Sequence, residues 1–445
     1  MYLVIILIVS ILLIIVLSSK MQIHPLLALV FACLFFGIFS GMPVGTIASS
    51  INDGFGQTLG KIGMIIVLGV IIGKFLEKSG GAFAMAEKII QLMGKKNVPA
   101  AMSFIGYIVA IPVFADSGFI ILTPLNRSLT KRAGLSFATT SIALALGLVA
   151  THTMVPPTPG PLAAAGILNA NLGLVLLIGM PIAFVAMLVC LFYSIKFVSK
   201  TYVDPAPELR DEDIKHLMVS APGWLKSSLP IFVPILLIVL KSFLEFFGID
   251  LSHSFLGQVI KFVGDPVMAL IVGLFLAFLL PKKLLKDHLS TTGWVGESLQ
   301  DAAIIILITG AGGSFGMILQ NSGIAKTLSL ILSEWPIGLW LPFILAAAIK
   351  TAQGSSTVAI ITTASILAPM MVDLGFDSEI GRAMFVVAIG AGSAVVSHLN
   401  DSLFWIFTQL TGVDVNFSLK RYTPGTFVLG TTAMIALSIL SLFVK

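Results

Sequence analysis

The sequence predicts an all-α, polytopic membrane protein built as an inverted repeat, with about ten crossings, two re-entrant hairpins and two broken helices. The first observation is composition: 57% of the 445 residues are hydrophobic, 11% are charged, and the mean hydropathy is +1.05. A soluble domain carries about 25% charged residues, so this chain lacks the polar side chains for a water-facing surface. The second observation is that helix-breaking residues interrupt apolar segments in the same order in each half of the chain.

Apolar runs of spanning length define the ordinary membrane segments. Lysine and arginine clusters flank these runs, and placing every cluster in the cytoplasm gives one consistent topology. In that topology both termini lie outside the cytoplasm, and the first run is a retained span because it lacks a basic start and a cleavage signature. The runs are residues 2–18, 26–42, 62–77, 173–195, 229–247, 266–281, 302–319 and 425–444. The clusters are Lys95-Lys96, Arg127 with Lys131-Arg132, Lys196 with Lys200, Lys282-Lys283 with Lys286, and Lys420-Arg421.

Residues 98–125 are predicted to form the first re-entrant hairpin. Cationic clusters flank both ends, so both ends should lie in the cytoplasm. Pro112, Asp116 and Gly118 interrupt the middle of the segment, where a helix would break. Each arm has about a dozen residues, which is too few to cross a hydrocarbon core of about 30 Å. The segment therefore turns back near the middle of the membrane.

Residues 339–371 are predicted to form a second hairpin that enters from the opposite side. Its flanks carry acidic side chains in place of cationic ones, and its middle, from Lys350 to Thr357, is polar and breakable. The opposite flanking charge indicates the opposite orientation. The acidic flanking residues are Glu334, Asp373, Asp377 and Glu379.

A broken helix is predicted after each hairpin, over residues 136–172 and 383–412. A proline-rich run after Thr151 breaks the first, and residues 397–402, which read Ser-His-Leu-Asn-Asp-Ser, break the second. Short similar motifs occur at matching positions of the two halves, such as Thr151-His152 and Ser397-His398. An inverted repeat of interrupted helices is the architecture of secondary transporters, whose site lies near the midplane.

The repeat predicts five parts of the chain. Two pairs of scaffold helices precede the two repeats, and a polar stretch of mixed charge links the halves in the cytoplasm. The parts are residues 1–60 (N-terminal scaffold), 61–200 (first repeat), 201–228 (cytoplasmic linker), 229–288 (second scaffold) and 289–445 (second, inverted repeat).

The four breaks are expected to converge, because irregular backbone at membrane depth is tolerated only inside protein or beside a wet cavity. The N-terminal ends of half-helices suit a carboxylate, and the breaks are rich in Ser, Thr, Asn and Gln. This combination favours a small hydroxy-acid or polyhydroxylated anion as substrate. The predicted substrate-binding residues are Ser117, Gly118, Thr151, His152, Gln353, Gly354, Ser355, Ser356, Thr357, His398 and Asn400.

Ionisable side chains at membrane depth are costly and so indicate function. Proton coupling is assigned to Asp116, His152 and Asp401, with Asp116 as the carrier and His152 as its relay or hydrogen-bond partner. The alternative for Asp116 is a carboxylate that caps a helix end, and the alternative for the histidines is a neutral imidazole bonding unwound backbone. Lys350 has three interpretations: it extends to the membrane surface, pairs with Asp401, or serves as counter-ion to a carboxylate.

Other chemistries lack their signatures in this sequence. Cys33 and Cys190 lie in apolar runs, as buried thiols do, and no basic face points to nucleic acid. Neither a zinc-protease motif nor a phosphate loop is found, so we expect no cofactor, no metal and no enzyme activity, and transport driven by an ion gradient. The alternative from a different class is a membrane-embedded hydrolase that uses Asp116, His152, His398 and Asp401 as a metal or acid–base site.

Four segments carry a resemblance to a known family. They are residues 111–118 (Ile-Pro-Val-Phe-Ala-Asp-Ser-Gly), Thr151-His152 with 155–161 (Val-Pro-Pro-Thr-Pro-Gly-Pro), 354–359 (Gly-Ser-Ser-Thr-Val-Ala) and 397–405 (Ser-His-Leu-Asn-Asp-Ser-Leu-Phe-Trp). In these segments, and in their order along nearly the whole chain, the sequence resembles the gluconate permease family of proton-coupled symporters. That family belongs to the ion-transporter superfamily and includes D-serine transporters.

The resemblance implies uptake of gluconate or a related sugar acid with protons across the bacterial inner membrane. It also implies scaffold helices, two hairpins and two broken helices, together with a homodimer, since transporters of this type are usually dimers. Two alternatives stay open: a carrier of D-serine or a short hydroxy acid, and a sodium-coupled carrier of small carboxylates.

Overall fold

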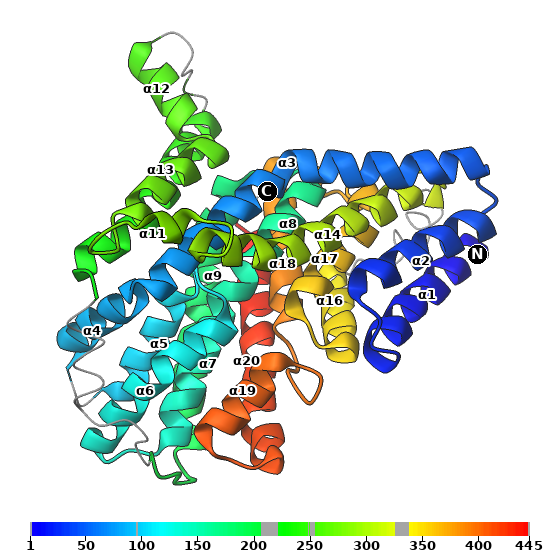
Figure 1. Cartoon of the computed structure of the whole chain (residues 1–445). Helices are drawn as coiled ribbons and strands as arrows, with labels where there is room; N and C mark the ends of the chain where they lie inside the picture. Colours follow the sequence, from blue (N-terminus) through cyan, green and yellow to red (C-terminus); the bar gives the residue numbers. More distant parts are fainter. Residues whose placement is uncertain are drawn as a thin grey trace.

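In the computed structural model, the described part of the chain comprises residues 2–94, 97–205, 221–247, 249, 254–324 and 338–443. Within these ranges the chain is helical and has no strand, so the predicted all-α fold is confirmed. Figure 1 shows the helices as one body, from which α12 stands away at one end. Lys95-Lys96, Glu334 and residues 206–220 of the predicted linker lie outside the described residues.

The N-terminal scaffold leads into one very long helix. Helices α1 (Tyr2–Ile15) and α2 (Pro25–Phe39) pack together, and a π-helical turn, η1 (Val16–Lys20), extends α1. Helix α3 (Val44–Lys78) then has 35 residues, of which the predicted span 62–77 is the second half. The predicted part boundary between residues 60 and 61 therefore falls inside a helix. The amphipathic α4 (Gly81–Met93) was not predicted; it follows Gly80, whose φ of 78° ends α3.

The first hairpin consists of α5 (Val98–Val109) and α6 (Ala115–Ala133). Pro112 lies between them, where its ring and missing N–H prevent the helix from continuing. The predicted end of the hairpin at residue 125 is wrong, because α6 continues to Ala133. It stops only at Gly134, which takes a left-handed conformation with φ 66°.

The first broken helix follows the predicted pattern. It consists of α7 (Phe137–Met154) and α8 (Pro159–Leu168), with the break at residues 155–158. Helix α9 (Leu172–Tyr193), extended by η2 (Ser194–Val198), completes the first half. The side chain of Asn171 caps α9 by accepting hydrogen bonds from the N–H groups of Gly173 and Leu174.

The second half repeats this order of elements. After the scaffold helices come a long helix, a hairpin, a broken helix and a final long helix, so the predicted repeat is present. The scaffold helices are α11 (Trp224–Phe246), α12 (Phe255–Val263) and α13 (Pro266–Phe278), the last two bent by 74°. The repeat comprises η3 (Lys286–Leu289), α14 (Trp294–Asn321), α16 (Trp340–Gln353), α17 (Ser356–Leu367), η4 (Ala368–Met370), α18 (Glu379–Ser393), α19 (Ser402–Thr411) and α20 (Val415–Ser441).

The halves are interlocked through their broken helices. Helix α8 of the first half packs against α17 of the second, and α19 of the second half packs against α6 of the first. Gly160 at the start of α8 permits the first contact, because a Cβ there would lie 2.8 Å from Ile360 Cδ1. In the second contact the rings of Phe119 and Phe407 lie 6.0 Å apart. The long helices α3 and α14 also pack along one another. This crossing brings the breaks of both halves to one region.

Helix length and composition identify the helices that could span a membrane. Within the described ranges six helices are long and apolar enough to cross a membrane, or seven if the bent pair α12–α13 is one span. Helices α1, α2, α5 and α17 are apolar but shorter. The protein therefore crosses the membrane several times, while the count of ten crossings stays a prediction.

Topology can be tested at the start of α11. Gly223 is exposed and has φ −61°, so cysteine fits there, and both native cysteines are buried. We expect a membrane-impermeant thiol reagent to leave Gly223→Cys unlabelled in intact cells and to label it in inside-out vesicles, because the linker, which includes Ser220, is predicted to lie in the cytoplasm. Efficient labelling from outside intact cells would reverse the predicted orientation.

Candidate functional site

A polar cavity of about 540 Å³ lies where the two halves interlock. Its wall comes from the tip of each hairpin, the end of α7, the break after α18, three positions on α14 and one on α20. The polar and ionisable lining residues are Asp116, Ser117, His152, Thr153, Asp301, Lys350, Gln353, Ser355, Ser356, Thr357, Ser397, Asn400, Asp401, Ser402 and Tyr422.

The tip of the first hairpin contributes the start of α6. No side chain caps this helix, so the N–H groups of its first turn lie uncapped beside the cavity. Asp116, in that first turn, accepts a hydrogen bond from the hydroxyl of Ser402, with 2.6 Å between the oxygens. This bond joins the first hairpin to the start of α19, 286 residues later in the chain.

The tip of the second hairpin is a sharp reversal at Gly354. Its φ of 94° is one that L side chains rarely adopt, and a Cβ there would overlap the carbonyl oxygen of Asn400. Ser355 then caps α17 by accepting a hydrogen bond from the N–H of Val358. Ser356 donates to the carbonyl of Ser393 at 2.8 Å, which ties the hairpin to the end of α18.

The second break centres on Asp401, which caps α19. One carboxylate oxygen accepts from the N–H of Leu403 at 3.0 Å, and the other accepts from the hydroxyl of Ser397 at 2.6 Å. That second oxygen also lies 2.6 Å from Nζ of Lys350, whose side chain is 1% exposed while that of Asp401 is 14% exposed. Of the three interpretations of Lys350, extension to the membrane surface is therefore wrong, and pairing with Asp401 is confirmed.

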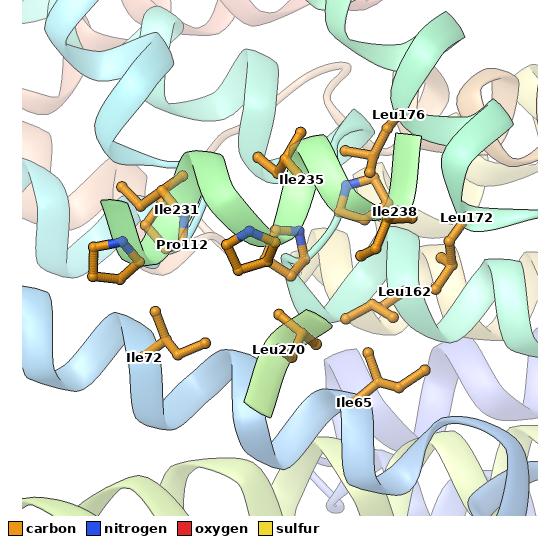
Figure 2. Close-up of a pocket in the computed structure, with 14 residues that line it drawn as sticks. Ile65, Ile72, Pro112, Leu162, Leu172, Leu176, Ile231, Ile235, Ile238 and Leu270 are labelled. Carbon is orange, nitrogen blue, oxygen red and sulfur yellow. The ribbon is translucent and has the colours of Figure 1, made fainter. Parts of the chain in front are cut away.

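The first break contributes to the cavity only through α7. Val149, His152 and Thr153 line it, whereas the proline run faces elsewhere. Pro156 and Pro157 line a separate apolar pocket of about 20 Å³ against α3, α9, α11 and α13. Figure 2 shows aliphatic side chains of these helices, such as Ile65, Ile235 and Leu270, around it. The proline run thus packs the broken helix against the scaffold.

The cavity includes most of the predicted site residues but not all. Asp116, Ser117, His152, Gln353, Gly354, Ser355, Ser356, Thr357, Asn400 and Asp401 line it. Gly118, Thr151 and His398 lie outside the lining. Thr151 instead donates its hydroxyl to the carbonyl of Tyr107 at 2.9 Å, and a ring nitrogen of His398 lies 2.8 Å from the carbonyl oxygen of Thr351.

The proposed pairing of Asp116 with His152 is not present as a direct contact. No hydrogen bond joins the two in the described part of the chain, and Nδ1 of His152 is buried without a partner there. The ring of His152 lies 6.0 Å from that of Phe114. The four-residue set considered for a hydrolase is also dispersed, because His398 is outside the cavity wall and Asp401 is engaged by Lys350.

Two ionisable cavity residues were missed by the sequence interpretation, and the lining residues Thr153, Ser397 and Ser402 were not among the predicted binding residues. Tyr422 on α20 is fully buried, its ring stacks on Phe407 at 4.9 Å, and its hydroxyl has no hydrogen-bond partner within the described residues. Asp301 on α14 pairs with Lys74 on α3 at 2.7 Å. Tyr422 directly follows Lys420-Arg421, a pattern typical of an aromatic residue at the membrane interface. The residues next to Asp301 in the sequence do not indicate a site.

Comparison with known proteins shows the family of the chain. The model of the GntP permease family matches residues 1–443 of the chain. The chain belongs to the GntP family of permeases. The predicted membership is thereby confirmed, and this GntP family member is a multi-pass protein of the inner membrane. Its relatives are permeases and transporters and not enzymes.

Three relatives and one solved structure illustrate the similarity. A gluconate permease of Pseudomonas aeruginosa is 34% identical over 443 residues, covering 96% of this chain and 95% of the relative. The D-serine transporter DsdX of Escherichia coli is 32% identical and covers 98% of each chain. An uncharacterized permease of Haemophilus influenzae is 35% identical, covering 92% of this chain and 86% of its own. The crystal structure of the YdaH transporter of Alcanivorax borkumensis matches with a TM-score of 0.62 at 14% sequence identity. The match covers 94% of this chain and 98% of the YdaH chain, so the two proteins share the fold.

Proposed function

We propose that this GntP family member is a secondary symporter that takes up gluconate, or a related sugar or hydroxy acid, with protons across the cytoplasmic membrane. The observation that carries the proposal is that three half-helix N-termini, those of α6, α17 and α19, meet at one polar cavity. The aligned peptide dipoles at these ends, and the uncapped N–H groups at the start of α6, favour an anion. The P. aeruginosa relative named as a gluconate permease supports a sugar acid.

The lining also suits the hydroxyl groups of a sugar acid. Ser117, Ser355, Thr357 and Asn400 supply short donors and acceptors from three separate segments. A volume of about 540 Å³ is within the range of small-molecule sites. We therefore assign substrate binding to the polar residues of this wall, including His152, Gln353 and Ser356 from the sequence prediction, and to the backbone at Gly354.

Proton coupling is assigned to the ionisable groups of the same wall. Asp401 has a cation as its partner, whereas Asp116 accepts a hydrogen bond from the neutral hydroxyl of Ser402. A carboxylate without a cationic partner is better suited to gain and lose a proton, so Asp116 is the proposed carrier. His152 acts as its relay through a bridging water or a change in conformation, and Asp401 is the second candidate.

Experiments can distinguish the proposal from alternatives in substrate and in driving ion. The DsdX relative favours D-serine as an alternative substrate, and a sodium gradient is the alternative driving force. The purified protein should be reconstituted in liposomes and offered labelled gluconate, lactate or D-serine under a pH or a sodium gradient. We expect gluconate to accumulate under the pH gradient and to leak out when a protonophore is added. Accumulation that follows sodium, or D-serine uptake that gluconate does not inhibit, would contradict the proposal.

We also propose that the protein is a homodimer. Light scattering of the purified protein would test this.

A further inference from the structure

Lys350 is the one lysine or arginine that lines the cavity within the described ranges. The other ionisable lining residues are Asp116, Asp301, Asp401, His152 and Tyr422. An anion that enters this space therefore faces three acidic side chains, of which Asp301 is paired with Lys74 and Asp401 with Lys350. Since like charges repel, a binding site for an anion here needs the ammonium group of Lys350 in addition to the helix ends.

The ion pair between Lys350 and Asp401 is costly as a purely structural device. Its lysine is 1% exposed and its atoms lie 2.6 Å apart, so both charges have lost most of their hydration. Buried ion pairs are often no more stabilising than well-packed apolar side chains of the same volume. The position, in the last turn of α16 directly before the tip at Gly354, indicates a role at the cavity.

The hydrogen bonds around the pair leave room for a second carboxylate. An ammonium group has three donors, and Asp401 is the acceptor that Lys350 reaches in the described part of the chain. If the ammonium group of Lys350 moves partly toward a ligand, the carboxylate of Asp401 still accepts two hydrogen bonds. They come from the N–H of Leu403 and the hydroxyl of Ser397. In the same wall, Nδ1 of His152 and Oη of Tyr422 are buried polar atoms without partners. Such atoms are costly unless a ligand or water satisfies them.

We infer that Lys350 binds the carboxylate of the substrate, sharing its ammonium group between that carboxylate and Asp401, which positions it. The inference rests on the proposed function and narrows it, because it assigns the carboxylate end of the substrate to the tip of α16. The hydroxyl-bearing end is left to the neutral polar side chains of the same wall. A substrate without a carboxylate has no partner for Lys350 and binds weakly.

The test compares gluconate with gluconamide, its neutral amide, in binding assays on the purified full-length protein. Lys350→Gln alone leaves Asp401 without a cation and is expected to be unstable, so the informative variant is the double substitution Lys350→Gln with Asp401→Asn. This variant removes both charges and keeps similar volumes. The control is Lys78→Gln with Glu297→Gln, which removes the 2.8 Å ion pair between α3 and α14 outside the cavity lining.

We expect the wild type and the control to bind gluconate about 10- to 100-fold more tightly than gluconamide, and the double variant to lose this preference while keeping its thermal stability. Retention of the full preference by the stable double variant would show that the pair is only structural and would overturn the inference. If the wild type prefers another carboxylate over its amide and the double variant loses that preference, the inference stands and the gluconate assignment fails. If no carboxylate in a panel that includes lactate and D-serine binds to the wild type, both fail.

Discussion

Replacing Gly354 with leucine is expected to abolish substrate uptake while leaving membrane insertion intact. The backbone at Gly354 has φ 94°, and any Cβ there would overlap the carbonyl oxygen of Asn400. A side chain must therefore push the second hairpin away from the break that carries Asp401. Displacements of about 1 Å at a binding site cost about 100-fold in rate, so we expect uptake to fall by at least about that factor.

Gly375 provides a matched control for this substitution. Its φ of 75° is also in the left-handed region, but a Cβ there meets no atom within 4 Å. Gly375→Leu therefore also places a side chain at a positive φ, at a cost of about 1–2 kcal/mol, but without the clash. We expect it to retain most of the uptake. Uptake is to be measured with labelled substrate at equal amounts of membrane-inserted protein. Normal uptake by a well-inserted Gly354→Leu variant would remove this tip from the site.

Asp116→Asn is expected to lose accumulation driven by a pH gradient while keeping exchange of substrate. The amide resembles the protonated acid in shape and can still bond to Ser402, but it can release no proton. With one proton per anion, a gradient of about one pH unit supports about tenfold accumulation. In the variant this ratio should fall to about one, while labelled substrate still exchanges across the membrane.

Asp414→Asn serves as the control for the loss of a carboxylate. Asp414 caps α20 by accepting a hydrogen bond from the N–H of Phe417, is exposed, and lies outside the cavity lining. Asparagine caps helices about as well as aspartate, so accumulation should be unchanged. If Asp116→Asn still concentrates substrate with the normal pH dependence, His152 or Asp401 becomes the proton carrier instead.

The sequence alone was sufficient for the elements that local chemistry decides. Proline cannot continue a helix, so Pro112 and the proline run after Thr151 mark breaks that the structure places within a few residues of the prediction. Glycine at Gly354 and the capping side chains Ser355 and Asp401 mark restarts for the same local reason. Local rules were weaker for helix ends, since α3 begins 18 residues before the predicted span and α6 ends eight residues after the predicted hairpin.

Only the tertiary structure decided which breaks share a cavity and which atoms meet in it. The proline run and His152 are close in sequence, yet the run packs on the scaffold while His152 faces the cavity. Lys350 and Asp401 are 51 residues apart, and Asp116 and Ser402 are 286 apart. Such pairs depend on how α8 crosses to α17 and α19 crosses to α6. Helix crossings arise from side-chain packing between distant segments, which sequence periodicity and local propensity do not encode.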